Sequence, residues 1–146
     1  MKTILDNIVK STALFLSNDM CIDILKIKRI EEIPYSPHNS LITLTNDSKM
    51  TVMINIDNSL FKFLFKKFFT KVQEDEKIAL IAALSDEIIN IVVGLSIKNF
   101  SSKYANCELG LPFKVSVQKR KEMIKKYPSQ SMCIVTGAGN FICTIL

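Results

Sequence analysis

Residues 76–100 read EKIALIAALSDEIINIVVGLSIKNF, which is the most strongly helical stretch of the chain. The stretch contains no proline and is rich in alanine, leucine and isoleucine. It begins with an acidic residue, which suits the positive end of a helix dipole. We therefore predict one long helix from Glu76 to Phe100, around which the other elements are arranged.

The spacing of residues within this helix predicts a buried face and an exposed face. At 100° per residue, one stripe of the helix is apolar and is expected to face the core. This stripe contains Ile81, Leu84, Ile88, Ile91, Val92 and Leu95. A separate row contains Glu87, Asn90, Ala83 and Gly94, with Asp86 alongside. We expect Glu87 and Asn90 to lie side by side and to point away from most of the core.

Shorter elements are predicted on the N-terminal side of the long helix. They comprise an amphipathic helix, a strand, a hairpin closed by a polar turn, and a helix that begins with a capping residue. In order, these elements span Lys2 to Ser17, Cys21 to Ile30, Leu41 to Thr45 paired with Met50 to Ile56, and a helix capped by Asp57 or Asn58. In the second hairpin arm Val52, Ile54 and Ile56 share one face, as expected for a sheet that helices cover on one side only.

A strand and a second hairpin are predicted after the long helix. Phe113 to Val117 alternates apolar and polar residues as a strand does, and the basic run Lys119 to Lys126 is expected to be a solvated strand end and loop. Met132 to Thr136 and Phe141 to Leu146 are expected to pair across a glycine-containing turn. The order of elements predicts a single α+β domain over residues 1–146, with a mainly antiparallel sheet, two long central helices and an N-terminal helix.

The distribution of charge argues against a nucleic-acid-binding protein. The chain has 19 basic and 14 acidic residues, a net charge of +5. The segment Lys119 to Lys126 alone has five basic residues and one acidic residue, a local +4 that leaves +1 elsewhere. Binding of single strands usually adds aromatic stacking surfaces, whereas this run has only Tyr127 beside it and the chain has no tryptophan.

The remaining composition favours a cytoplasmic protein without a metal site of its own. No secretion signal is visible, and the longest apolar run, Ile78 to Leu84, is far shorter than the ~20 residues of a membrane span. The four cysteines show no CxxC spacing and are expected to be reduced thiols. The single histidine, His38, has no neighbouring ligand in the sequence, so a zinc site is not expected.

The row containing Glu87 and Asn90 has features that stability alone does not explain. Asn90 interrupts an isoleucine- and valine-rich segment, and Gly94 costs roughly 0.8–1.0 kcal/mol relative to alanine inside a helix. An amide can hold a water molecule in a chosen direction, and a carboxylate can hold a cation or a lysine. The alternative is an ordinary solvated face, with Gly94 as a helix-packing contact.

The residues Asp86 to Gly94, followed by Leu109-Gly110-Leu111-Pro112, resemble the CheX-like branch of the CheC/CheX/FliY chemotaxis phosphatases. This family has a helix with Glu, two residues and Asn, and then a proline just over twenty residues later. The order of elements is also similar, so the resemblance extends over nearly the whole chain. The family motif often has Asp or Ser four residues before the Glu, where this chain has Ala83.

The resemblance implies an enzyme that hydrolyses the phospho-aspartate of a CheY-type response regulator. It implies that Glu87 pairs with the regulator's lysine, that Asn90 orients the attacking water, and that Gly94 and Pro112 support the motif. The regulator is expected to supply Mg²⁺, so that the chain itself binds no cofactor. A homodimer is also implied, with the edge of the last strand as its contact surface. The alternative is a module of the same fold that binds the regulator without dephosphorylating it.

Overall fold

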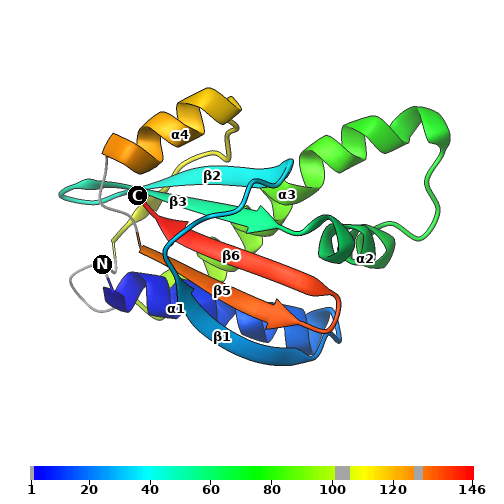
Figure 1. Ribbon diagram of the computed structural model, residues 1–146, viewed down its shortest axis with the longest axis horizontal. Coiled ribbons are helices and arrows are strands. Elements are labelled where there is room, and N and C mark those ends of the chain that lie inside the picture. Colours follow the sequence, from blue (N-terminus) through cyan, green and yellow to red (C-terminus); the bar gives the residue numbers. More distant parts are fainter. Residues whose placement is uncertain (1, 101–105, 127–129) are drawn as a thin grey trace.

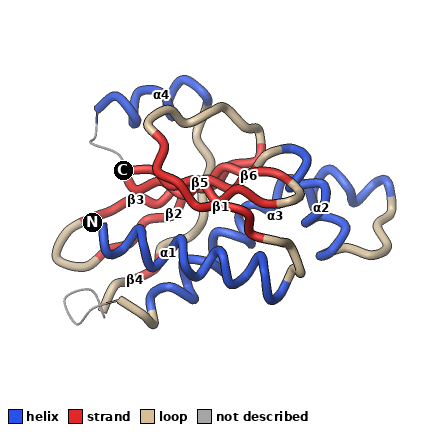
Figure 2. The backbone as a smooth tube through the Cα atoms, turned by 60° about the horizontal axis from the view of Figure 1, so that its bottom comes forward, coloured by secondary structure: helices blue, strands red, loops and turns tan. Residues whose placement is uncertain are grey.

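The computed structural model describes residues 2–100, 106–126 and 130–146. In this part of the chain, six antiparallel strands form one sheet with helices on both faces (Figures 1 and 2). The helical elements are α1 (Lys2–Leu14) with a π-helical continuation (Phe15–Asp19), α2 (Asn58–Phe68), α3 (Glu74–Ile97) and α4 (Val117–Lys126). The strands are β1 (Ile24–Ile30), β2 (His38–Thr45), β3 (Lys49–Ile56), β4 (Glu108–Leu109), β5 (Gln130–Thr136) and β6 (Gly139–Ile145). The predicted α+β class with an antiparallel sheet is confirmed.

Both predicted hairpins form, and the last strand joins them. The strand order is β1-β5-β6-β3-β2-β4, in which β6 pairs with β5 on one side and with β3 on the other. The prediction that the last strand forms an exposed edge is therefore wrong. Periodicity identifies strands but not their neighbours, and the open edges in the described chain belong to β1 and β4.

Helices α1 and α3 pack side by side on one face of the sheet (Figure 2). The apolar side of the predicted amphipathic helix, formed by α1 and its π-helical continuation, is buried: Ile4, Leu5, Ile8, Val9, Thr12, Phe15 and Leu16 are all at most 5% exposed. These side chains join buried residues of α3 and of the sheet in one core. This core holds the second half of α3 rigidly against the sheet.

The buried face of α3 is rotated relative to the predicted one. Leu95 is 40% exposed and Ile91 is half-buried, whereas Ser85 and Ser96 are buried together with Ile89 and Val93. The two serines are tolerated because each hydroxyl donates a hydrogen bond, Ser85 to the Asn39 carbonyl and Ser96 to the Val93 carbonyl. A stripe chosen by hydropathy omits such small polar residues.

The opposite face of the sheet is covered by α4 (Figure 2). Two predictions are therefore wrong: the basic run is a helix instead of a strand end and loop, and helices do not cover only one face. The predicted strand from Phe113 to Val117 is also wrong, because Phe113 makes only an isolated bridge to Leu41 and Val117 begins α4. All residues from Val52 to Ile56 are buried, because the second face of β3 packs beneath α4. The contact is polar in part, since Arg120 donates to Asn55.

Helix α2 and the first half of α3 project beyond the sheet (Figure 1). In this projecting arm Ile78 is 80% exposed. Helix α3 has the length and hydropathy of a membrane span, with an 18-residue window of mean hydropathy 2.0 that is 33% buried. The core helix of a folded domain shares this property, and the second half of α3 packs against α1, β2 and β3.

Candidate functional site

Glu87 and Asn90 lie on the exposed side of the second half of α3. Residues three apart on a helix are neighbours on its surface, and the adjacent Ile88 and Ile89 are fully buried. Neither the Glu87 nor the Asn90 side chain makes a hydrogen bond or ion pair with the described part of the chain. The core therefore holds the helix in place while it leaves a carboxylate and an amide accessible to another molecule.

Gly94 leaves an open space one turn beyond Asn90. A Cβ atom built at Gly94 would meet nothing within 4 Å in the described structure. The interpretation of Gly94 as a helix-packing contact is therefore wrong. Ala83, one turn before Glu87, is exposed and adds only a methyl group. Small residues thus flank the pair on both sides, and a partner surface can approach the helix closely.

A cluster of hydrogen bonds holds the neighbouring carboxylate of Asp86. Its Oδ1 accepts from Lys114 Nζ at 3.0 Å and from the Ser40 hydroxyl. Lys114 Nζ also donates to Ser85 Oγ at 2.9 Å and to the Asn39 carbonyl at 3.2 Å. Asp86 is therefore directed to β2, whereas the carboxylate of the next residue, Glu87, has no partner in the described part of the chain. Sequence reasoning missed Lys114, because nothing in a separation of 28 residues indicates this contact.

The segment that contains Pro112 runs along the outer edge of β2. The Gly110 amide donates to the Thr43 carbonyl at 2.8 Å, and the Phe113 amide donates to the Leu41 carbonyl at 2.8 Å. A Cβ atom at Gly110 would lie 3.2 Å from the Thr43 carbonyl oxygen, so glycine allows this close approach. Pro112 is half-buried between these anchors, and the segment then reaches α3 through Lys114.

The structure thus brings Glu87, Asn90 and Gly94 to one helix face. It places Pro112 in the segment that runs along the edge of β2, the strand that packs beside this helix. No group of three or more His, Cys, Asp or Glu side chains that could hold a metal ion occurs among residues 2–100, 106–126 and 130–146.

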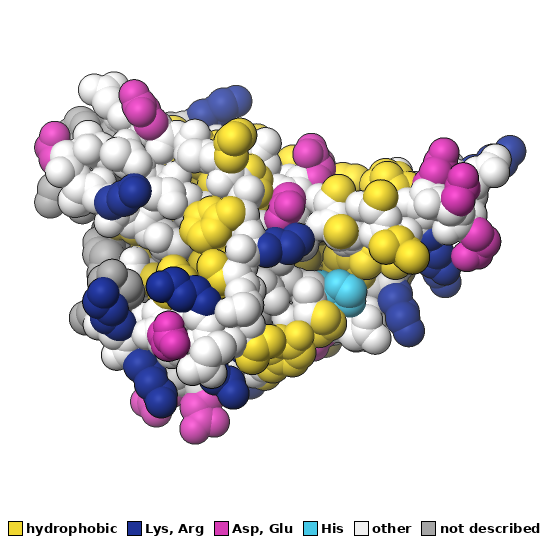
Figure 3. All heavy atoms as spheres, turned by 90° about the horizontal axis from the view of Figure 1, so that it is seen from above, with side chains coloured by type: hydrophobic (Ala, Val, Ile, Leu, Met, Phe, Trp, Pro, Cys, Tyr) yellow, Lys and Arg dark blue, Asp and Glu magenta, His cyan; other side chains and the backbone are white. Residues whose placement is uncertain are grey.

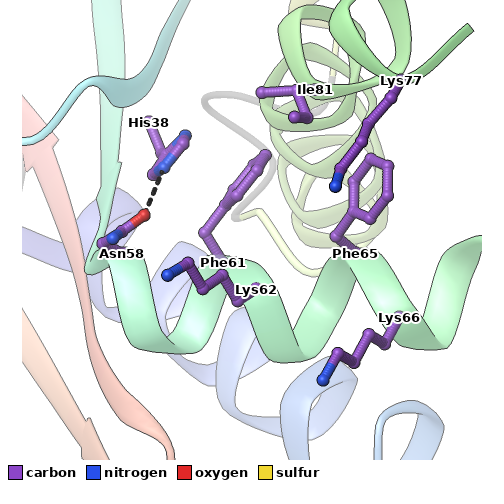
Figure 4. Close-up of a pocket in the computed structure, with 8 residues that line it drawn as sticks. All are labelled: His38, Asn58, Phe61, Lys62, Phe65, Lys66, Lys77 and Ile81. Atoms are coloured by element: carbon purple, nitrogen blue, oxygen red, sulfur yellow. Dashed lines mark hydrogen bonds between the residues drawn. The ribbon is translucent and has the colours of Figure 1, made fainter. Parts of the chain in front are cut away.

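A hollow of about 410 Å³ lies between α2 and the first half of α3 (Figure 4). Its polar residues are His38, Asn58, Lys62, Lys66 and Lys77, and its apolar residues are Phe61, Phe65 and Ile81. The His38 ring stacks on Phe61 at 3.6 Å, and its Nε2 lies 3.0 Å from Asn58 Oδ1. In Figure 3 the single histidine lies where the projecting arm meets the body.

This hollow does not include Glu87 or Asn90. The hollow opens beside Ile81, six residues before Glu87 and on another side of the helix. The pair instead lies on an open helix surface. Such a surface does not enclose a small substrate, but it can enter a site on another macromolecule.

Crystal structures of chemotaxis proteins share this architecture. CheX from Desulfovibrio desulfuricans has a TM-score of 0.71 at 13% identity, over 99% of this chain and 98% of that chain. CheX from Vibrio vulnificus has a TM-score of 0.71 at 14% identity, over 97% of this chain and 94% of that chain. The chain has the CheX fold. The resemblance read from the sequence is confirmed at this level.

A further CheX-like match comes from the crystal structure of a CheX-CheY-BeF3-Mg²⁺ complex from Borrelia burgdorferi. Its TM-score is 0.71 at 14% identity, over 96% of this chain and 94% of that chain. No protein family model and no curated protein matches the sequence. At these identities the CheX likeness establishes the fold, and the roles of individual residues stay predictions.

Proposed function

We propose that this CheX-like chain is a cytoplasmic chemotaxis phosphatase that removes the phosphoryl group from the phospho-aspartate of a CheY-type response regulator. The observation that carries the proposal is the exposed, unpartnered pair Glu87 and Asn90 on a rigid helix of the CheX fold. The CheX-CheY-BeF3-Mg²⁺ complex from Borrelia burgdorferi supports a CheY-type partner.

The proposed mechanism divides the work between the two proteins. The regulator supplies Mg²⁺ and the phosphorylated aspartate, and this chain supplies two side chains. Asn90 accepts a hydrogen bond from the attacking water and directs the water at phosphorus, while Glu87 pairs with the regulator's lysine. Phosphoryl transfer depends mainly on positioning and charge stabilisation, so one well-placed amide is sufficient to accelerate hydrolysis.

The surroundings of the pair support this division. Lys114 and Ser40 hold Asp86 against β2, so Glu87 is left to meet a cation from outside. The open space at Gly94 allows the helix to enter a concave site. The half-buried Pro112 and its neighbours stiffen the strand edge from which Lys114 reaches Asp86.

Ala83 is the reason to consider a second candidate function. The family motif often has Asp or Ser at this position, and the exposed Ala83 provides no polar group there. The second candidate function is a module that binds the regulator through the same surface without hydrolysis. Regulator binding with an unchanged phosphate half-life favours this second function.

The deciding experiment follows phosphate release from a phosphorylated CheY-type regulator with Mg²⁺ present. We expect the wild-type chain to accelerate release and Asn90→Ala to lose most of the acceleration, about 100-fold or more, which is the size of effect seen when one positioned catalytic side chain is removed. Asn18→Ala is the matched control, because Asn18 is also an exposed asparagine but lies outside α3. Equal rates for wild type and Asn90→Ala, with both folded, contradict the proposal.

We assign the proposed homodimer contact to the edge at β1. The outer side of this strand is open, and its residues Leu25 and Ile27 are 66% and 43% exposed. A shallow apolar hollow beside it is lined by Leu14, Ile24 and Ile27, among others. A second copy that pairs along this edge would satisfy the free backbone groups and cover these side chains.

A further inference from the structure

A buried arginine lies on the face of the sheet opposite α3, the helix that carries Glu87 and Asn90. Arg120 of α4 is only 5% exposed. Its Nη1 donates to Asn55 Oδ1 at 2.9 Å, and the Tyr35 ring lies 5.2 Å from its Cζ. No carboxylate within the described chain pairs with this guanidinium. A buried charge without a counter-charge is costly, so this arrangement requires an explanation.

The unsatisfied atoms of this cluster are both hydrogen-bond donors. Arg120 Nε and Asn55 Nδ2 are buried and have no acceptor among the residues that the structure describes. Asn55 already uses its oxygen to accept from Arg120, so the two side chains cannot satisfy one another further. What the cluster lacks is an acceptor, and an anionic acceptor would also neutralise the guanidinium.

A hollow of about 240 Å³ adjoins this arginine. None of its lining residues is acidic: they are Tyr35, Pro37, Asn39, Lys114, Val115, Ser116, Val117 and Arg120. The lining also includes the first turn of α4, where Ser116 Oγ accepts from the Lys119 amide at 3.1 Å. A helix N-terminus carries partial positive charge and free amides. Lys114, which also lines the hollow, pairs with Asp86 of α3 at 3.0 Å.

We propose that this hollow binds a small oxyanion, either a phosphate or a carboxylate group, through Arg120. A guanidinium presents its donors in a planar fork that matches such groups, and charge-assisted hydrogen bonds of this kind are strong. The first turn of α4 adds positive potential at the mouth of the hollow, and Lys114, whose charge is partly offset by Asp86, lies beside it. Tyr35, which is 59% exposed, covers the guanidinium and is the side chain that must move as the anion enters.

This site is independent of the proposed phosphatase activity. It uses the second face of the sheet, and none of its lining residues belongs to the row that contains Glu87 and Asn90. Two of the lining residues, Lys114 and Asn39, also contact α3, through Asp86 and Ser85 respectively. Anion binding and phosphate release from the regulator can therefore be measured separately.

The test is a titration of the full chain with inorganic phosphate and, separately, with acetate, at constant ionic strength set with chloride. The readouts are the amide NMR signals of Val115 to Val117, the side-chain amide signal of Asn55, and the Tm. We expect saturable shifts of these signals and a rise in Tm with at least one of the two anions. Saturation by phosphate alone or by acetate alone identifies the preferred group.

Arg120→Gln should weaken anion binding at least tenfold, because it removes the positive charge and the paired N–H donors of the guanidinium. If this variant does not fold, Lys114→Gln compared with Lys121→Gln decides the question. Both remove one positive charge, but only Lys114 lines the hollow, whereas Lys121 is exposed elsewhere on α4. The proposal is overturned by shifts that do not saturate with either anion, or by equal affinities for wild type and Arg120→Gln, or for the two lysine variants.

Discussion

Asp57 occupies its predicted position, but its side chain accepts a hydrogen bond from a different amide than expected. It stands at the N-cap of α2, as expected, but it makes no side-chain cap. Its Oδ2 instead accepts from the Asn140 amide at 2.8 Å, and the Asn140 carbonyl accepts from the Asp57 amide at 3.0 Å. The residue type predicted a short polar acceptor at a chain turn, but only the fold decided which amide it meets.

Gly94→Ala should raise the stability of the protein and lower its proposed phosphatase activity. The helix should gain about 0.8–1.0 kcal/mol in free energy of unfolding, because alanine is the better helix former and no neighbour lies within 4 Å. Denaturant unfolding measures this gain. Under the proposed function, the added methyl group should slow regulator dephosphorylation. Ala82→Gly, an exposed change elsewhere on α3, should lower stability by a similar amount and leave the rate of a folded sample unchanged.

Cys143 should make the protein less stable at alkaline pH. Complete burial raises the pKa of its thiol from 9.0 to about 12. Below pH 9 the thiol is protonated in both the folded and the unfolded state. As the pH rises from 9 towards 12, only the unfolded state loses the proton, so the free energy of unfolding falls by about 1.4 kcal/mol per unit.

The measurement is the free energy of unfolding of the wild type and of Cys143→Ala between pH 8 and 10.5. The variant should start lower, because truncation leaves a cavity, but it should decline less steeply. Burial also raises the pKa of Cys133, so some slope should persist in the variant. Parallel declines in the two proteins would show that Cys143 does not contribute.

At the scale of elements, the basic run shows where patterns of charge mislead. Five of the ten residues of α4 are lysine or arginine, so the segment has little apolar content. Its burial depends on one charged side chain, Arg120, which packs on β3 through Asn55 and under Tyr35. A helix that is mostly polar is stabilised by its contacts with the sheet, and these contacts have no periodic signal in the sequence.

The two halves of α3 should differ in hydrogen exchange. Residues 74–83 belong to the projecting arm and are mostly exposed, whereas buried side chains recur from Leu84 to Ser96. Local opening requires less free energy where few buried contacts are lost. Amides of residues 78–83 should therefore exchange faster than those of residues 88–93, as measured by NMR or mass spectrometry. Uniform protection along α3 would indicate that another molecule covers the arm.

At the scale of the whole molecule, the proposed dimer should respond to salt. The open strand β1 carries Lys26, Lys28 and Arg29, all exposed, so two copies paired along this edge bring like charges together. Salt screens this repulsion, and the dimer should be tighter in about 0.5 M than in 0.05 M NaCl. Sedimentation equilibrium at both salt concentrations measures the change.

Ile27→Lys should weaken the dimer further by adding charge to the edge. Lys121→Gln on α4, on the other side of the molecule from the α1 layer, should leave the dimer unchanged (Figure 2). If the protein is a monomer at every salt concentration, or if Ile27→Lys leaves the dimer unaffected, β1 is not the dimer contact.

The sequence by itself determined the elements with strong periodicity and their class. The long helix, the stripe of α1, both hairpins and the exposed row with Glu87 and Asn90 follow from local spacing, because a helix or strand repeats its environment every few residues. For the same reason, the Glu87 and Asn90 part of the family motif could be read from residues close together in the chain.

Only the tertiary structure decided the strand order, the second covered face and the partners of isolated polar residues. It placed β6 inside the sheet, joined Lys114 to Asp86, and buried Arg120 beside Asn55. Each of these contacts joins segments far apart in the chain. A contact of this kind leaves no pattern in either segment alone, because its energy depends on surfaces that meet only after the chain has folded.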